Sequence, residues 1–234
     1  MYQVSDLPGR LPPGNRHLRP QPPLYHHAME VFTAFILAGG KSTRMGSDKA
    51  FLDLHGKLLI VHAVDLARTV TQGVKIVGDP EKLSPFGPVV DDIYTTRGPL
   101  GGIHAALAST STVWNLVLGV DLPFVEPRFL NYLVTQAQSA EVQSAEAQSE
   151  PALVTVPSAN GHLQPLCAVY RKEFCQSADR ALSAGQNKID ALFGEVLTHI
   201  IQESELTTLG FSPAMFRNLN TPLDWQRAKQ ELAY

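Results

Sequence analysis

The chain has 234 residues, of which 44% are hydrophobic, and this length suits one α/β domain with a large core better than two domains. Its formal net charge of −3 provides no broad attraction to nucleic acid or to an anionic membrane, and no uninterrupted apolar run approaches the length of a membrane span. The two cysteines, Cys167 and Cys175, lack CxxC spacing, which argues against a disulfide framework or a zinc site and indicates free thiols.

The N-terminal segment differs in composition from the rest of the chain. Residues 1–28 are rich in proline and show no apolar periodicity, so we expect a disordered extension over residues 1–30 and a single domain over residues 31–234. No apolar stretch follows Arg10 or Arg16 as a secretory signal would require, and we therefore expect a cytoplasmic protein. Met29 stands just before the first strand-like run, so the extension is either a functional tail or the product of an upstream start codon.

The first half of the chain alternates strand and helix patterns. Residues 31–37 form an apolar run that ends at two glycines, the pattern of a buried parallel strand entering a loop. Residues 60–67 space their apolar side chains as an amphipathic helix does, and residues 74–77 indicate the next strand. Residues 88–90 lead to two aspartates, and the glycines of residues 98–102 are expected in the loop before a helix at 103–108.

The strongest strand pattern is that of residues 114–120, which runs directly into Asp121-Leu122-Pro123. Open parallel sheets bind ligands at the carboxyl ends of their strands, so the loops after Leu37, Val90 and Val120 should converge on one site. The alternation predicts a three-layer α/β/α sandwich with a mostly parallel, Rossmann-like sheet.

The second half contains a low-complexity segment and a hairpin signal. Residues 136–150 repeat a Gln-Ser-Ala-Glu theme, typical of a solvated helix extension or a flexible insertion rather than of a site. Strand patterns at 152–156 and 166–170 are separated by Asn160-Gly161, a strong turn pair. Helical patterns around residues 174–182 and 222–232 end the chain, the latter with Thr221 as a predicted cap.

The glycine-rich segment at residues 37–49 carries the main functional signal. Glycines after a strand allow the backbone N–H groups to approach phosphate oxygens, and Arg44 and Lys49 add positive charge. Gly40-Lys41-Ser42 imitates the end of a Walker A loop, but that motif needs a glycine where Phe35 stands, and no G-x-G-x-x-G occurs in the chain. The sequence therefore disfavours both a kinase-like P-loop and a dinucleotide-binding fold.

Residues 37–49 resemble the signature L-A-G-G-x-S-x-R-M-G-x-x-K of the molybdenum cofactor guanylyltransferases, within the nucleotidyltransferases of the sugar-nucleotide type. The segments Gly-Pro-Leu-Gly-Gly at 98–102, Asp-Leu-Pro at 121–123 and Asn-Leu-Asn-Thr-Pro at 218–222 resemble that family's later motifs, in the expected order. The resemblance covers roughly residues 32–231. It implies a nucleotidyltransferase domain that uses GTP, molybdopterin and Mg²⁺, with cofactor-biosynthesis proteins and acceptor molybdoenzymes as further partners.

The resemblance also implies site residues. The expected nucleotide contacts are Leu37, Ala38, Gly39, Gly40, Lys49, Asp121 and one of Asp91 and Asp92, with Asp92 the closer match to the motif. Lys49, Arg44 and Asp121 are the expected catalytic residues, and Asp121 is the expected ligand of Mg²⁺. Asn218, Asn220 and Gln164 are candidates for the pterin side, because amides match the donors and acceptors of a pterin.

The expected reaction needs no covalent nucleophile from the protein. The terminal phosphate of molybdopterin attacks the α-phosphorus of GTP in line and expels pyrophosphate, so catalysis consists of alignment and charge neutralisation. A cytidylyltransferase acting on the same cofactor, a sugar-phosphate nucleotidyltransferase and a non-catalytic nucleotide-binding adaptor are the alternatives. In the family, cytidylyl relatives usually carry alanine at the first glycine, so Gly39 favours GTP.

Overall fold

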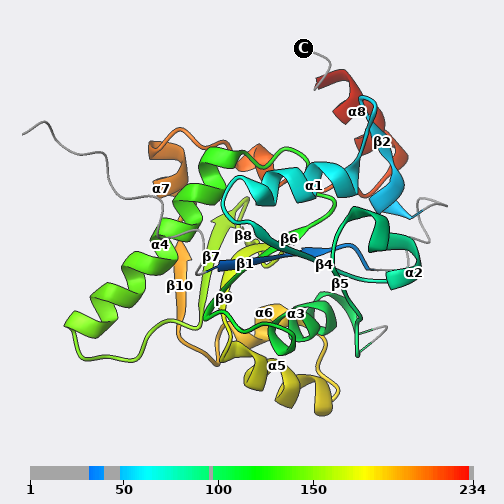
Figure 1. The fold of residues 1–234 in the computed structure, drawn as a ribbon. Helices are drawn as coiled ribbons and strands as arrows, with labels where there is room; N and C mark the ends of the chain where they lie inside the picture. Colours follow the sequence, from blue (N-terminus) through cyan, green and yellow to red (C-terminus); the bar gives the residue numbers. More distant parts are fainter. Residues whose placement is uncertain (1–31, 40–47, 95–96, 232–234) are drawn as a thin grey trace, which may run out of the picture.

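The computed structural model describes residues 32–39, 48–94 and 97–231 (Figure 1). The expected N-terminal extension, Gly40 and Arg44 lie outside the described residues. The strands are β1 (Phe32–Leu37), β2 (Asp53–Leu54), β3 (Lys57–Leu58), β4 (Gly73–Val77), β5 (Val89–Val90), β6 (Trp114–Gly119), β7 (Val154–Ala159), β8 (His162–Leu163), β9 (Cys167–Arg171) and β10 (Thr198–Ile201). The α-helices are α1 (Leu59–Arg68), α2 (Pro80–Leu83), α3 (Gly98–Ala108), α4 (Pro127–Glu146), α5 (Phe174–Ser183), α6 (Ile189–Leu192), α7 (Glu203–Thr208) and α8 (Pro222–Glu231).

The central sheet has the strand order β10-β7-β9-β6-β1-β4-β5, with β8 paired to β7 outside that path. Strands β6, β1, β4 and β5 are mutually parallel, as are β7 and β10, whereas β9 runs antiparallel to both β6 and β7. All six residues of β1 and of β6 are buried, as expected for central strands that are covered on both faces. The predicted mostly parallel sheet is therefore confirmed.

Helices cover both faces of this sheet (Figure 1). Alternate side chains of β1 enter two separate apolar cores, Ala34 and Ile36 on the face of α1 and α4, and Phe35 and Leu37 on the face of α3 and α5. This arrangement is the predicted three-layer α/β/α sandwich. Within the described segments, no helix is both long enough and apolar enough to cross a bilayer.

The glycines of residues 98–102 do not lie in a loop before the helix, and that expectation is wrong. They lie in the first turns of α3, which begins at Gly98. A Cβ at Gly101 would lie 2.9 Å from the backbone oxygen of Tyr94, and one at Gly102 would lie 3.4 Å from the methyl groups of Leu37. The glycines therefore serve the close approach of the helix to β1 and to the segment after β5.

The low-complexity segment at residues 136–150 mostly extends a helix and is not a flexible insertion. Helix α4 continues through it to Glu146, and Ala137 within it is fully buried. Glu141 accepts a hydrogen bond of 2.6 Å from the guanidinium of Arg171 on β9, which attaches the helix to the sheet. The predicted turn at Asn160-Gly161 is also confirmed, because both residues have positive φ, 53° and 74°, and join β7 to β8.

The two cysteines are free thiols, as the spacing indicated. Cys167 is fully buried on β9, and burial raises the pKa of its thiol far above the usual range. Such a thiol is inert as a nucleophile or metal ligand.

Candidate functional site

The loops at the carboxyl edge of the sheet are linked by backbone hydrogen bonds. The N–H of Val120 donates to the oxygen of Leu37 at 3.2 Å, and the N–H of Ala38 donates to Val77 at 3.0 Å. The N–H of Gly78 donates to Val90 at 3.1 Å, so the ends of β6, β1, β4 and β5 form one continuous edge. The strand ends at Leu37, Val90 and Val120, from which the three loops start, therefore lie at one edge of the sheet, as expected.

Gly39 lies at this edge in an open setting. It is exposed, it has no positive φ, and among the described residues a Cβ built on it would meet only backbone atoms of Gly78 and Val77, at 3.8 and 3.9 Å. These are ordinary contact distances. Neither the backbone conformation of Gly39 nor its described neighbours therefore require the absence of a side chain.

Lys49, Asp121 and Asn220 meet at the same edge, although 171 positions separate the first from the last. The Lys49 ammonium lies 3.0 Å from Oδ2 of Asp121 and also donates to the side-chain oxygen of Asn220. The side chains of Lys49 and Asp121 are only 18% and 16% exposed, so each charge depends on the other for compensation. One ammonium thus bridges two oxygen atoms of the kind that hard cations prefer.

Local structure holds each of these three residues in place. Lys49 opens a 3₁₀ turn, Lys49–Phe51, which Asp48 caps by accepting a hydrogen bond from Ala50. Asp121 follows β6, and a Cβ at Gly119 would lie 3.0 Å from the Asp121 carboxylate, so the glycine leaves room for that carboxylate to fold back over the strand end.

The segment that carries Asn220 is fixed at both ends. The N–H of Leu219 donates to the backbone oxygen of Asp121 at 3.2 Å. Thr221 and Asp224 form a reciprocal cap, in which the threonine hydroxyl accepts from the Asp224 N–H at 3.1 Å and the Asp224 carboxylate accepts from the Thr221 N–H at 2.9 Å. Helix α8 then begins at Pro222, which confirms the predicted helix start.

The structure distinguishes the two aspartates after β5. Asp91 is exposed, whereas Asp92 is partly buried and accepts a hydrogen bond of 3.0 Å from the N–H of Tyr94. The pKa of the Asp92 carboxyl is raised, mainly by burial. The hydrogen bond from the Tyr94 N–H lowers this pKa, the charge of Asp91 raises it further, and His104 lowers it. Strand β5 is two positions from β1 in the sheet, so Asp92 lies on the order of 10 Å from Leu37 along the edge.

The pterin candidates lie in different settings. Asn218 and Asn220 are exposed in the segment that contacts Asp121. Gln164 lies between β8 and β9, near the end of β6, because the N–H of Gly119 donates to Leu166 at 2.7 Å. The amide nitrogen of Gln164 donates to the backbone oxygens of Ala159 and His162, both at 3.2 Å, so it stabilises its own turn.

Some residues of the site were not predicted. Gly78 is one, since a Cβ there would lie 3.4 Å from the N atom of Gly39 and 2.6 Å from a methyl group of Leu83. Its position directly after the strand pattern at 74–77 was an available signal. Tyr94 is another; its side-chain hydrogen-bond partner, Asp179 on α5, is 85 positions away, so no local pattern indicates its role.

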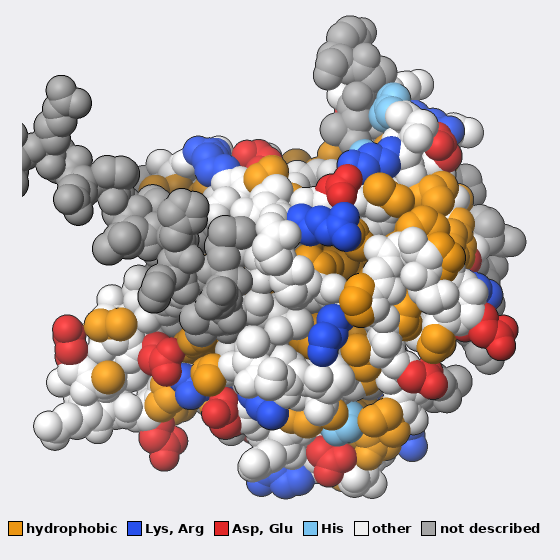
Figure 2. All heavy atoms as spheres, in the orientation of Figure 1, with side chains coloured by type: hydrophobic (Ala, Val, Ile, Leu, Met, Phe, Trp, Pro, Cys, Tyr) orange, Lys and Arg blue, Asp and Glu red, His pale blue; other side chains and the backbone are white. Residues whose placement is uncertain are grey.

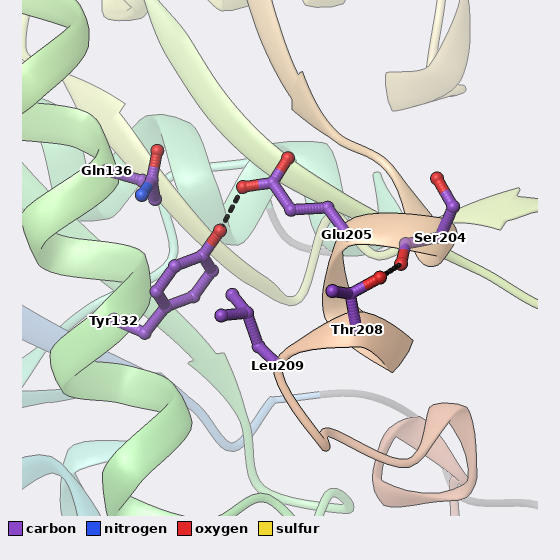
Figure 3. Close-up of a pocket in the computed structure, with 6 residues that line it drawn as sticks. All are labelled: Tyr132, Gln136, Ser204, Glu205, Thr208 and Leu209. Carbon is purple, nitrogen blue, oxygen red and sulfur yellow. Dashed lines mark hydrogen bonds between the residues drawn. The ribbon is translucent and has the colours of Figure 1, made fainter.

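Within residues 32–39, 48–94 and 97–231, no group of three or more His, Cys, Asp or Glu side chains could hold a metal ion. Figure 2 shows basic and acidic side chains interspersed over one face. A shallow pocket between α4 and α7, shown in Figure 3, is lined by Tyr132, Gln136, Ser204, Glu205, Thr208 and Leu209.

Solved structures show which class of protein has this fold. A CMP-2-keto-3-deoxy-manno-octonic acid synthetase in complex with CTP shares the fold, with a TM-score of 0.65 over 86% of this chain and 98% of that chain at 12% identity. The molybdopterin-guanine dinucleotide biosynthesis protein A of Archaeoglobus fulgidus is more similar in sequence, at 25% identity, with a TM-score of 0.70 over 86% of this chain and 98% of that chain. The chain therefore has the nucleotide-diphospho-sugar transferase fold.

Sequence comparison narrows that class to one family. Residues 34–200 match the model of the MobA-like NTP transferase domain. A probable molybdenum cofactor guanylyltransferase of Pelotomaculum thermopropionicum is 33% identical over 199 residues, 84% of this chain and 91% of the relative. A molybdenum cofactor guanylyltransferase of Syntrophotalea carbinolica is 28% identical over 206 residues, 87% of this chain and 93% of the relative. The chain belongs to the MobA-like NTP transferase family, which confirms the resemblance found in the sequence.

Proposed function

We propose that the chain transfers GMP from GTP to the terminal phosphate of molybdopterin, releasing pyrophosphate and forming the guanine dinucleotide cofactor. The contact of Lys49 with Asp121 and Asn220, at the sheet edge where β1 also ends, is the observation that carries the proposal. It gathers a phosphate-binding cation, a metal-binding carboxylate and an amide at the edge where sheets of this kind bind nucleotides. The guanylyltransferase relatives match this chain over most of its length.

The base of the nucleotide is assigned to the backbone after β1. Leu37, Ala38 and Gly39 are the proposed contacts of guanine, and Gly40 and Arg44, which lie outside the described residues, are proposed from the sequence as further contacts of the nucleotide. Gly39 supports this assignment because the fold itself tolerates a Cβ there. Glycine at position 39 then leaves space for a ligand, and the packing of the described residues does not require it.

The phosphates and the metal are assigned to Lys49 and Asp121. Mg²⁺ prefers oxygen ligands and keeps several waters, so one carboxylate together with substrate phosphates is a sufficient protein contribution. Asp121 Oδ2 would hold the ion, which supplies positive charge against the triphosphate and the departing pyrophosphate. Lys49 would exchange its partner Asp121 for the phosphates, so that neither charge is left unpaired in the partly buried site.

The acceptor side is assigned to the amides near Asp121. Asn218 and Asn220 are proposed to face the pterin from the C-terminal segment. Gln164 would contribute through its amide oxygen, because its nitrogen already donates within its own turn. Asp92 is the proposed aspartate of the nucleotide site, in preference to the exposed Asp91.

The test is the incorporation of labelled GTP, CTP or ATP into molybdopterin in the presence of Mg²⁺. We expect GTP to be the preferred substrate, and preference for CTP would overturn the assignment of the base. Lys49→Ala and Asp121→Ala are each expected to abolish most turnover without unfolding the chain. Lys82→Ala, which removes a surface ion pair with Asp79 at 3.4 Å, is the matched control and should leave turnover unchanged.

A further inference from the structure

The turn that carries Asp92 is attached to a helix from the second half of the chain. The hydroxyl of Tyr94 donates to Oδ1 of Asp179 on α5 at 3.0 Å, across a sequence separation of 85 residues. The N–H of the same tyrosine donates to Asp92 Oδ1 at 3.0 Å. Tyr94 therefore connects the Asp92 carboxylate, through its own backbone, to α5.

His104 on α3 supports this connection. Its ring meets the Tyr94 ring edge-on, with centroids 5.0 Å apart, and its Nε2 lies 3.5 Å from the same Asp179 oxygen. The side chain is nearly buried, and its Nδ1 has no hydrogen-bond partner among the described residues. His104 thus packs against the Tyr94 ring and faces the carboxylate that the Tyr94 hydroxyl donates to.

The backbone of Tyr94 has little freedom to shift. Its oxygen accepts a hydrogen bond from the N–H of Arg97 at 3.1 Å. Helix α3 approaches the same oxygen so closely that a Cβ at Gly101 would lie 2.9 Å from it. The backbone contacts fix one side of the residue and the phenol fixes the other, so the position of Asp92 depends on both.

We propose that Tyr94 is a positioning residue for the nucleotide, which holds the Asp92 turn in the binding-competent position through Asp179 and His104. This inference rests on the proposed nucleotide site. The role is not one of holding the helices together, because α3 and α5 already pack through buried apolar side chains, among them Leu107, Phe174 and Ala178. Loss of the phenol hydroxyl therefore leaves the fold intact and allows the turn to occupy other positions.

The first experiment compares two tyrosine variants. Tyr94→Phe removes only the hydroxyl that donates to Asp179. Tyr132→Phe removes a hydroxyl that donates in the same way to a carboxylate on another helix, Glu205, in the pocket of Figure 3. GTP affinity is measured with Mg²⁺ by calorimetry. We expect Tyr94→Phe to weaken GTP binding about three- to tenfold, the factor that one hydrogen bond of average strength is worth, and Tyr132→Phe to leave it unchanged.

The second experiment tests the partner. Asp179→Ala is expected to weaken GTP binding at least as much as Tyr94→Phe does, because it removes the oxygen that faces both Tyr94 and His104. The double variant is expected to be no weaker than Asp179→Ala alone, since Tyr94→Phe removes an interaction that Asp179→Ala has already removed. Asp179→Asn keeps an acceptor oxygen for the phenol and should restore most of the affinity. At saturating GTP the turnover number of all these variants should remain near that of the parent chain, with the change confined to KM.

The outcomes separate this inference from the proposed function. If the parent chain binds GTP and Tyr94→Phe binds it equally well, or if the effects of Tyr94→Phe and Asp179→Ala add, the positioning role is refuted. If the parent chain does not bind GTP, the proposed function fails instead. Amide hydrogen exchange at Ile93 and Tyr94, measured without ligand, then still decides the role: faster exchange in Tyr94→Phe supports it, and unchanged exchange refutes it.

Discussion

Gly39→Ala is the substitution that most directly tests the assignment of the base. Among the described residues the new methyl group meets only Gly78 Cα at 3.8 Å and Val77 O at 3.9 Å, which are ordinary contact distances. Replacing glycine by alanine where the backbone allows it stabilises a chain by roughly 0.4–1 kcal/mol, because the unfolded chain loses freedom. We therefore expect the melting temperature to stay equal or rise slightly.

GTP binding should respond in the opposite direction. If the base lies against Gly39, an added methyl group overpacks that contact, which costs about 1–3 kcal/mol. This corresponds to a GTP affinity roughly five- to 150-fold weaker. Calorimetric titration with GTP and with CTP measures both the loss and any gain for the smaller base.

Gly78→Ala is the matched control on the neighbouring strand end. Its Cβ would lie 2.6 Å from a methyl group of buried Leu83, and its φ of 157° is unfavourable for alanine, so stability should fall by about 1–3 kcal/mol. The pair thus predicts a variant that folds but binds poorly and a variant that folds poorly. Unchanged GTP affinity in a well-folded Gly39→Ala protein would remove Gly39 from the base site.

Three further experiments test other parts of the structure. Burial raises the pKa of Asp92, so the folded chain holds the carboxyl proton more tightly than the unfolded chain does, and the ionised carboxylate lowers the stability of the fold. Asp92→Asn should therefore raise the melting temperature near about pH 7 and weaken GTP binding. The gain in melting temperature should be small, because water screens this partly exposed charge, and it should shrink toward about pH 4. An equal gain at both pH values would contradict this sign. Gly101→Ala places a Cβ 2.9 Å from the Tyr94 backbone oxygen, so that oxygen must move and GTP binding should weaken. Gly102→Ala has its nearest contacts at 3.4 Å and should leave the Tyr94 turn in place. Amide hydrogen exchange at that turn measures the difference between the two variants. Phe129→Ala opens a void in a fully buried aromatic cluster and should cost about 3–5 kcal/mol in chemical denaturation; a loss below about 1 kcal/mol would show that the cluster is not closely packed.

The elements that the sequence predicted are those whose signal is local. Strands β1 and β6 are long apolar runs, and α1 has a clear amphipathic period, so their type could be inferred without knowing their neighbours. The hairpin at Asn160-Gly161 follows from the conformations that these two residues tolerate. The sheet edge at which Asp121 lies follows in turn from the strand that precedes it.

The features that the sequence did not predict depend on contacts between distant segments. The helical start at Gly98 reflects the approach of α3 to Tyr94 and Leu37, which composition alone cannot show. Strand β10 is short and partly exposed, and it is a strand only because β7 offers it a parallel edge. The contact of Lys49 with Asn220 joins the two ends of the described chain, and no spacing rule relates residues so far apart.

The pairing of Lys49 with Asp121 has a consequence for how substrates enter the site. Both side chains are mostly shielded from water, so in the ligand-free state each charge is neutralised by the other. A triphosphate alone would draw Lys49 away and leave Asp121 as an unpaired carboxylate, and a divalent cation alone would leave Lys49 unpaired. If the proposed roles of Lys49 and Asp121 hold, only the two together satisfy both residues, and we expect the nucleotide to enter as its Mg²⁺ complex. The Lys49 ammonium also donates a hydrogen bond to the side-chain oxygen of Asn220. Movement of Lys49 toward the phosphates would therefore also release Asn220 and the C-terminal segment that carries it.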